Sequence, residues 1–129
     1  MKDFYLNLCS KSSVFSTNTG SEFTVPLRPP VYLSGSWTCA VTEMLLPKAT
    51  TIKVKCLLAN FIQSSVVGET RRPALRVFFS ENQHLTFTPE YIPVTDQLLD
   101  TLVFELVDEK GNNLALSGET YLRLHFKQW

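Results

Sequence analysis

The sequence lacks an excess of charge of either sign, because twelve basic residues balance twelve acidic ones over 129 residues. A protein dedicated to nucleic acid normally has a basic excess, so nucleic acid is not an expected partner. Long hydrophobic runs are also missing, and none approaches the roughly 20 residues that a membrane-spanning helix needs. With 44% hydrophobic residues the composition is that of a globular protein, and we expect one domain over residues 1–129 without a membrane span.

Cysteine is scarce, and Cys9, Cys39 and Cys56 are odd in number and follow no paired spacing. This pattern argues against a disulfide framework and predicts buried free thiols in a reducing compartment. Cys39 and Cys56 together supply only two of the four ligands that a structural zinc site uses. Lys2 and Asp3 lead directly into an aromatic segment, so we expect no signal peptide and synthesis inside the cell.

Residues for catalysis are equally few, since His84 and His125 are the only histidines. Ser80 lies four residues before His84, but no nucleophile elbow surrounds it. Asp96 and Asp100 can share one face of a helix, yet paired carboxylates alone do not define a glycosidase. Glycine patterns that bind phosphates or dinucleotides are absent. We therefore expect a protein that is not an enzyme and that has no cofactor and no metal.

What the sequence has in abundance is alternation of apolar and polar residues, which is typical of β-strands. The segments that alternate, or that read as short strands between turns, are 4–9, 23–27, 37–45, 52–56, 74–79, 84–94, 102–107, 114–116 and 118–128. Pro26 cannot donate to a strand ladder, so 23–27 is predicted to be an edge strand or bulged. Segment 57–68 is either extended or a short helix, and 95–102 is predicted to contain one helical turn. Eight to nine short strands separated by turns predict an all-β, antiparallel two-sheet sandwich, and a single jelly roll of about eight strands fits the length.

Segment 37–45 is the clearest strand. Trp37, Cys39 and Val41 share one face, Leu45 continues that face, and Glu43 interrupts it. The predicted core of the two sheets contains Trp37, Val41, Phe78, Phe104 and Phe126. In segment 52–56 the alternation predicts that Lys53 and Lys55 face solvent.

The order of these motifs resembles a small protein of Maverick/Polinton elements and adintovirus-like DNA viruses. The similar stretches are "FYLNLCSKSS", "FTVPLRPPVYLSGSWTCAVTEMLLP", "YIPV", "LVDEKGNNLALSG" and "LHF". The matching residues are Phe4, Phe23, Val25, Leu27, Gly35, Trp37, Glu43, Pro47, Tyr91, Pro93, Val94, Asp108, Gly111, Leu124 and Phe126.

This resemblance implies a minor capsid protein, a single jelly roll that forms the pentameric vertices of an icosahedral capsid. It implies a homopentamer as the assembly, the major capsid protein of the same virus as a partner, and the virion capsid as the location after synthesis in the host cytoplasm or nucleus. None of the matching residues is catalytic in that family. A cement-type minor capsid protein is the alternative, because the chain is too short for a penton with large projections.

A subunit interface is expected at exposed loops and strand edges. The candidates are Arg71, Arg72, Tyr91 and Trp129. Trp129 either anchors in a neighbouring subunit or folds over the edge of its own sheet. The polar loop of residues 12–21 is a further candidate for contact with another capsomer.

Two rival functions remain open from the sequence. A carbohydrate- or receptor-binding sandwich would use exposed aromatic residues such as Tyr32, Tyr91 or Trp129. A small enzyme on a β scaffold would need His84 or His125, and no convergent nucleophile accompanies either of them.

Overall fold

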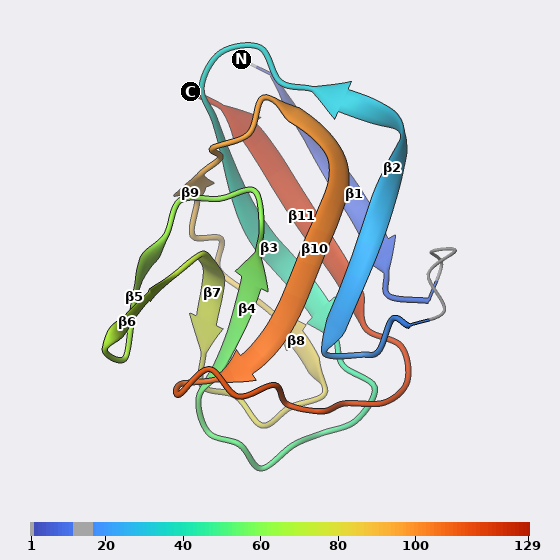
Figure 1. Cartoon of the computed structure of the whole chain (residues 1–129), viewed down its shortest axis with the longest axis vertical. Helices are drawn as coiled ribbons and strands as arrows, with labels where there is room; N and C mark the ends of the chain where they lie inside the picture. Colours follow the sequence, from blue (N-terminus) through green and yellow to red (C-terminus); the bar gives the residue numbers. More distant parts are fainter. Residues whose placement is uncertain (1, 12–16) are drawn as a thin grey trace.

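The computed structural model describes residues 2–11 and 17–129, which form strands and no helix (Figure 1). Sheet A has the strand order β1–β11–β3–β8, with β9 also paired to β3. Sheet B has the order β2–β10–β4–β7, and β5 and β6 form a separate two-stranded sheet. The strands of sheet A are β1 (Asp3–Cys9), β3 (Trp37–Leu45), β8 (His84–Thr86), β9 (Ile92–Pro93) and β11 (Tyr121–Gln128). Those of sheet B are β2 (Glu22–Tyr32), β4 (Lys55–Ala59), β7 (Ala74–Phe78) and β10 (Leu98–Asp108), and the pair apart is β5 (Ser65–Val67) and β6 (Thr70–Arg72).

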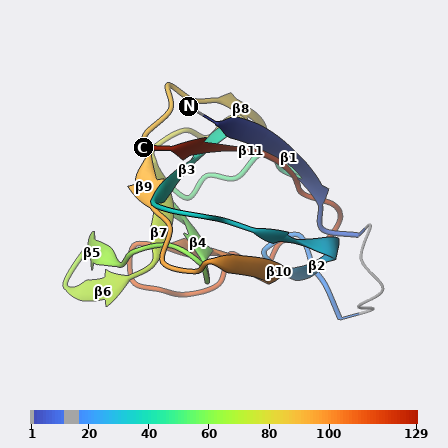
Figure 2. The same ribbon diagram turned by 90° about the horizontal axis from the view of Figure 1, so that it is seen from above.

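All of the strand pairs are antiparallel, and the two sheets lie face to face (Figure 2). The chain passes repeatedly from one sheet to the other, so that β1, β3 and β11 enter sheet A while β2, β4 and β10 enter sheet B. The predicted all-β, antiparallel sandwich is therefore confirmed. The β5–β6 pair projects from the flank opposite to β1 and β2 (Figures 1 and 2). In the described part of the chain, no helix is long and apolar enough to cross a membrane.

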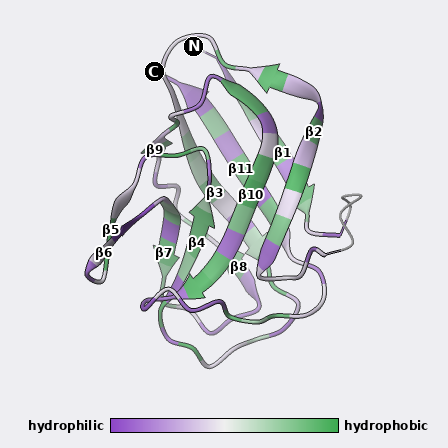
Figure 3. Ribbon diagram, in the orientation of Figure 1, coloured by the Kyte–Doolittle hydropathy of each residue, from purple (hydrophilic) through white to green (hydrophobic). Residues whose placement is uncertain are grey.

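The core lies between the two sheets, because apolar side chains alternate with polar ones along the strands (Figure 3). Phe104 of β10 stacks on Phe23 at a centroid distance of 5.3 Å, and Phe61 contacts both Phe104 and Phe126. The five residues predicted for the core all lie in it, and each is at most 7% exposed. β2 lies at the edge of sheet B, as Pro26 predicts.

A bulge in β3 corrects the predicted facing of its second half. Val41 pairs with Leu124, but the next pair joins Glu43 to Arg123, so Thr42 is the extra residue. An inserted residue reverses which face the following side chains occupy. Consequently Met44, and not Leu45, is buried in the core.

Lys55 is the second correction, because its side chain is fully buried and does not face solvent. Its Nζ donates hydrogen bonds to the carbonyl oxygens of Ile52, at 2.6 Å, and Ser80, at 2.5 Å. Burial lowers the pKa of Lys55, and the charge of Glu81 raises it by a smaller amount. The buried amine thus joins the two loops that flank β4 and β7.

Three further expectations were wrong or are now decided. Segment 95–102 contains no helical turn, because β10 begins at Leu98 and pairs with β2. Segment 57–68 contains no helix, because it ends β4, turns at 60–61 and then forms β5. Segment 114–116 forms no strand, and the turn at 108–111 before it contains Gly111 with a φ of 89°.

Candidate functional site

The outer face of sheet A carries the most organised group of polar side chains. Strand alternation points the odd-numbered residues of β1 and β11 away from the core. The pairing places Tyr5 beside His125 and Asn7 beside Arg123. Residues far apart in the sequence therefore meet on this face.

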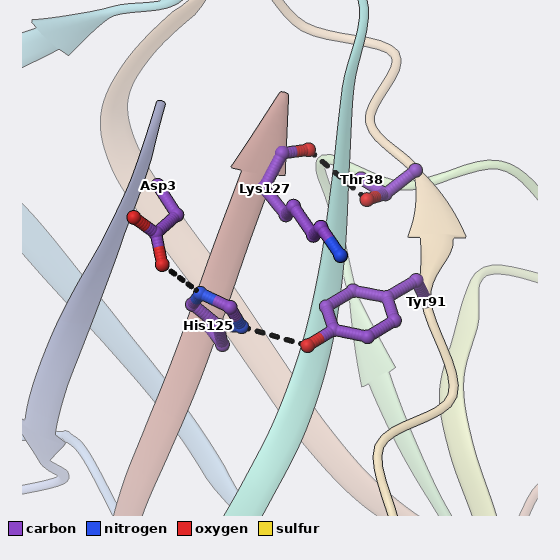
Figure 4. A network of polar contacts seen from close by, with 5 residues as sticks. All are labelled: Asp3, Thr38, Tyr91, His125 and Lys127. Carbon is purple, nitrogen blue, oxygen red and sulfur yellow. Dashed lines mark hydrogen bonds and ion pairs between the residues drawn. The ribbon is translucent and has the colours of Figure 1, made fainter. Parts of the chain in front are cut away.

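His125 lies at the centre of a network that extends across the sheet (Figure 4). Its Nε2 lies 2.8 Å from Oδ2 of Asp3 in β1, and its Nδ1 lies 2.7 Å from the hydroxyl of Tyr91, just before β9. Because Nε2 faces a carboxylate, we assign the ring proton to Nε2, so Nδ1 accepts a hydrogen bond from the Tyr91 hydroxyl. The imidazole is only 8% exposed although it belongs to the outer face.

Ring contacts surround this network. Tyr5 stacks on His125 at 4.4 Å, and the guanidinium of Arg123 lies 4.3 Å from the centre of the Tyr5 ring. On the other side, Nζ of Lys127 lies 5.6 Å from the Tyr91 ring, and Thr38 donates a hydrogen bond to the Lys127 carbonyl. Each cation–π contact at an exposed site contributes about 0.5–1 kcal/mol. The cluster joins β1, β11, β3 and the segment before β9.

A carboxylate, an imidazole and a phenol in sequence resemble a proton relay, but the geometry favours a structural role. Burial raises the pKa of Tyr91, and the neighbouring Tyr5 and Asp3 raise it further, so the phenol keeps its proton at neutral pH. The hollow on the same face is lined by other residues, and neither His125 nor Tyr91 belongs to its wall. The network therefore holds strands of sheet A together.

That hollow occupies about 600 Å³ at the other end of the outer face of sheet A. Its wall contains Asn7, Leu8, Cys9, Glu43, Leu45, His84, Tyr121, Leu122 and Arg123. Nε2 of His84 lies 2.5 Å from Oε2 of Glu43, and both side chains are about half exposed. The hollow thus combines aliphatic and aromatic surface with an exposed imidazole–carboxylate pair.

A second polar cluster borders the hollow. Oε2 of Glu119 accepts hydrogen bonds from the Tyr121 hydroxyl, at 2.5 Å, and from the Cys9 thiol, at 3.3 Å. These bonds lower the pKa of Glu119, and the bond from Tyr121 has the larger effect. The same hydrogen bond raises the pKa of Tyr121 to about 12. Glu119 is therefore an anion at neutral pH.

The residues predicted for the interface are not brought together by the fold. Arg71 is exposed on β6, while Arg72 is half-buried and its guanidinium packs at the turn that contains Gly111. Tyr91 belongs to the His125 network, and Trp129 follows the end of β11. The Trp129 side chain is 73% exposed, while its backbone N–H donates to the Ser36 carbonyl. Trp129 is thus fixed through its backbone and does not cover its own sheet.

The other candidates for chemistry are separated. The Ser80 hydroxyl accepts a hydrogen bond from the Asn82 N–H, whereas the imidazole of His84 lies against Glu43. Asp96 lies in a loop and Asp100 in β10, so no helix places them together.

The thiols of Cys39 and Cys56 lie on strands of different sheets, and burial raises the pKa of each. Within residues 2–11 and 17–129, no three or more His, Cys, Asp or Glu side chains form a group able to hold a metal ion. Part of the loop predicted to contact another capsomer, residues 12–16, lies outside the described residues.

Sequence reasoning missed the His125 network and the buried Lys55. The one signal for the network was parity, since Tyr5 and His125 both alternate with apolar residues along their segments. No protein-family model matches this sequence, and the search of curated proteins finds no match either.

Proposed function

We propose that this chain is a structural protein of a virus capsid, a minor capsid subunit that forms the pentameric vertex. The resemblance to the capsid protein of Polinton-like elements suggests this role, and the strand order is the observation that supports it best. In this proposal the chain acts in the virion, with copies of itself and the major capsid protein as its partners.

The strand order agrees with a jelly roll. Without β9 and the β5–β6 pair, eight principal strands remain in chain order: β1, β2, β3, β4, β7, β8, β10 and β11. Sheet A then contains the first, eighth, third and sixth of them, and sheet B the second, seventh, fourth and fifth. This order supports a jelly roll, an architecture common among viral capsid proteins.

The surface also suits assembly. Large apolar side chains are exposed at the periphery of the sandwich, among them Tyr32 at 69%, Phe79 at 74% and Trp129 at 73%. Aromatic residues of this kind are enriched at the energetic centres of protein interfaces. The polar groups of the outer face bind one another.

Native mass spectrometry of the purified protein tests this proposal. A mass of five chains supports the vertex, whereas three chains favour a capsomer or a fibre-like assembly. The matching experiment is coexpression with the major capsid protein of the same virus. A monomer that also stays out of the assembled shell would refute the capsid role, and incorporation as a monomer would favour the cement-type alternative.

A receptor- or carbohydrate-binding module is the second candidate, because an exposed tyrosine and a carboxylate line the hollow on sheet A. Tyr121 is 46% exposed there and donates a hydrogen bond to Glu119, and Glu43 is the carboxylate of the lining. A glycan array separates this function from the first one: specific binding that Tyr121→Ala abolishes would support it, and an array without binding would dismiss it.

A further inference from the structure

β1 forms an open edge of sheet A. Among the described residues it pairs only with β11, over seven residues from Asp3 to Cys9. At its two ends the Gln128 N–H donates to the Lys2 carbonyl, and the Ser10 N–H donates to the Thr120 carbonyl. In an antiparallel ladder the hydrogen-bonded pairs alternate with unbonded ones, so the even-numbered residues of β1 bond to β11. The backbone N–H and C=O groups of Asp3, Tyr5 and Asn7 therefore point away from β11, toward the open edge.

The other sheet edges are protected. β2, the neighbouring edge of sheet B, contains Pro26, Pro29 and Pro30, which cannot donate to another strand. β8 and β9 are only three and two residues long. The side chain of Arg76 of β7 reaches across to the Thr88 carbonyl and the Glu90 carboxylate. β1 has none of these devices, and a long unprotected edge of this kind is a template for pairing with another chain.

The β5–β6 arm, residues 65–72, in turn needs a further strand to be stable. It is a two-stranded ribbon, which is only marginally stable by itself in water. Val67 anchors it in a small cluster with Cys56 and Val107 on sheet B, while the next side chain, Val66, is 66% exposed. Val67 pairs with Thr70 around a two-residue turn, so the backbone groups of Val66 and its partner Arg71 point outward.

The two features lie on opposite flanks of the sandwich (Figures 1 and 2). A contact between them joins different surfaces of two copies, which is the head-to-tail arrangement that gives a ring when the rotation between copies closes. The charges also suit this pairing. The start of β1 presents Lys2 and Asp3, and the arm presents Glu69 and Arg71, all of them exposed.

We propose that the β5–β6 arm of one copy pairs with the β1 edge of the next, so that the arm extends sheet A of its neighbour. Backbone hydrogen bonds supply this contact, as in other complexes formed by strand addition. The number of copies in the ring rests on the proposed vertex function, but the pairing of arm and edge does not.

Two proline variants block the two sides of the contact separately. Asn7→Pro removes an N–H that points away from β11, so the β1–β11 ladder stays intact. Val66→Pro removes an outward N–H from the arm by the same reasoning. The matched controls Asn7→Ala and Val66→Ala alter the side chains but keep the backbone donors. Circular dichroism and the unfolding midpoint verify that all four variants fold.

Native mass spectrometry then gives the decisive readout. We expect a ring for the wild type and for both alanine controls, and a monomer for each proline variant. An equimolar mixture of the two proline variants retains one intact arm and one intact edge, so it forms a heterodimer and stops there. Because the blocked surfaces belong to different variants, a self-complementary contact would not give this result.

The outcomes separate this inference from the vertex function. If the wild type is a pentamer and both folded proline variants are pentamers too, the arm–edge contact is wrong while the vertex proposal stands. If the proline variants are monomers but the wild-type ring has another number of copies, the contact stands and the vertex is wrong. A wild type that stays monomeric up to millimolar concentration overturns the contact. If one proline variant fails to fold, the other one and its alanine control decide alone.

Discussion

The hydroxyl of Tyr91 lies 2.7 Å from Nδ1 of His125, and this contact ties the segment before β9 to β11. Asp3 holds the opposite nitrogen of the same imidazole, so three separate segments meet at one ring. The imidazole of His125 thus fixes the outer face of sheet A. The proposed assembly needs this face as a rigid surface next to the β1 edge.

Removal of the Tyr91 hydroxyl tests the structural role of this contact. Tyr91→Phe keeps the ring but leaves Nδ1 of the mostly buried His125 without its donor. We expect a loss of about 1 kcal/mol in the free energy of unfolding, measured by urea denaturation. Tyr32→Phe is the matched control, since that side chain is 69% exposed, and it should change the stability by less than about 0.5 kcal/mol. Equal effects of the two variants would contradict a specific role for Tyr91.

A pair of phenylalanines tests the core. Phe104 is fully buried and stacks on Phe23, whereas Phe79 is 74% exposed. We expect Phe104→Ala to lose about 3–5 kcal/mol of unfolding free energy, because it removes buried apolar surface and leaves a cavity. Phe79→Ala should change the stability by about 0.5 kcal/mol or less in chemical denaturation. In an assembled ring or shell Phe79 is a contact candidate, so the comparison belongs to the dissociated chain.

The sandwich and its core could be predicted from the alternation of apolar and polar residues, because this period of two does not depend on which strands pair. The bulge at Thr42 could not be predicted, since one inserted residue reverses the facing of Glu43 and Leu45 without changing the composition. The segment that contains Asp96 and Asp100 had local helical signals, but pairing of Leu98 and Leu99 with β2 decided its conformation.

The candidate site was harder to predict than the fold. Asp3 and His125 are 122 residues apart, and only the pairing of β1 with β11 brings them together. Lys55 was placed in solvent by the alternation of segment 52–56, but in β4 it shares the inward face with Leu57 and Ala59, which belong to the core. The interface candidates were chosen for charge and aromaticity, and the fold distributes them over three regions. Sequence patterns thus gave the strands, while the long-range pairing that builds the site required the structure.

The buried amine of Lys55 predicts a specific dependence of stability on pH. Burial lowers its pKa in the folded state, whereas in the unfolded chain it returns to its ordinary value. Between the two values the unfolded chain binds more protons, so the free energy of unfolding rises with pH and is flat with respect to this group below the window. The neutral amine still has two N–H groups for the Ile52 and Ser80 carbonyls.

We expect Lys55→Met to lose this rise when urea unfolding is measured from neutral pH up to the ordinary pKa of lysine. The control is Lys53→Met, which replaces an exposed lysine two residues earlier and should keep the wild-type slope. A slope that Lys55→Met leaves unchanged would mean that the amine titrates alike in both states.

The hydrogen bond between Tyr121 and Glu119 predicts a late ionisation of one tyrosine. The carboxylate accepts the phenolic proton and disfavours the phenolate, which raises the pKa of Tyr121 to about 12. Glu119→Gln removes the negative charge, so we expect this ionisation to move toward the ordinary tyrosine value of about 10. Ultraviolet absorbance of tyrosinate measures the shift as a difference titration of wild type against variant, with circular dichroism at the same pH to show that the fold persists.

Tyr121→Phe identifies the step, because it removes the late ionisation and leaves the others in place. A flat difference between wild type and Glu119→Gln would mean that the Glu119 contact at the rim of the hollow does not persist in solution, and the anionic rim considered for a sugar ligand would lose its support.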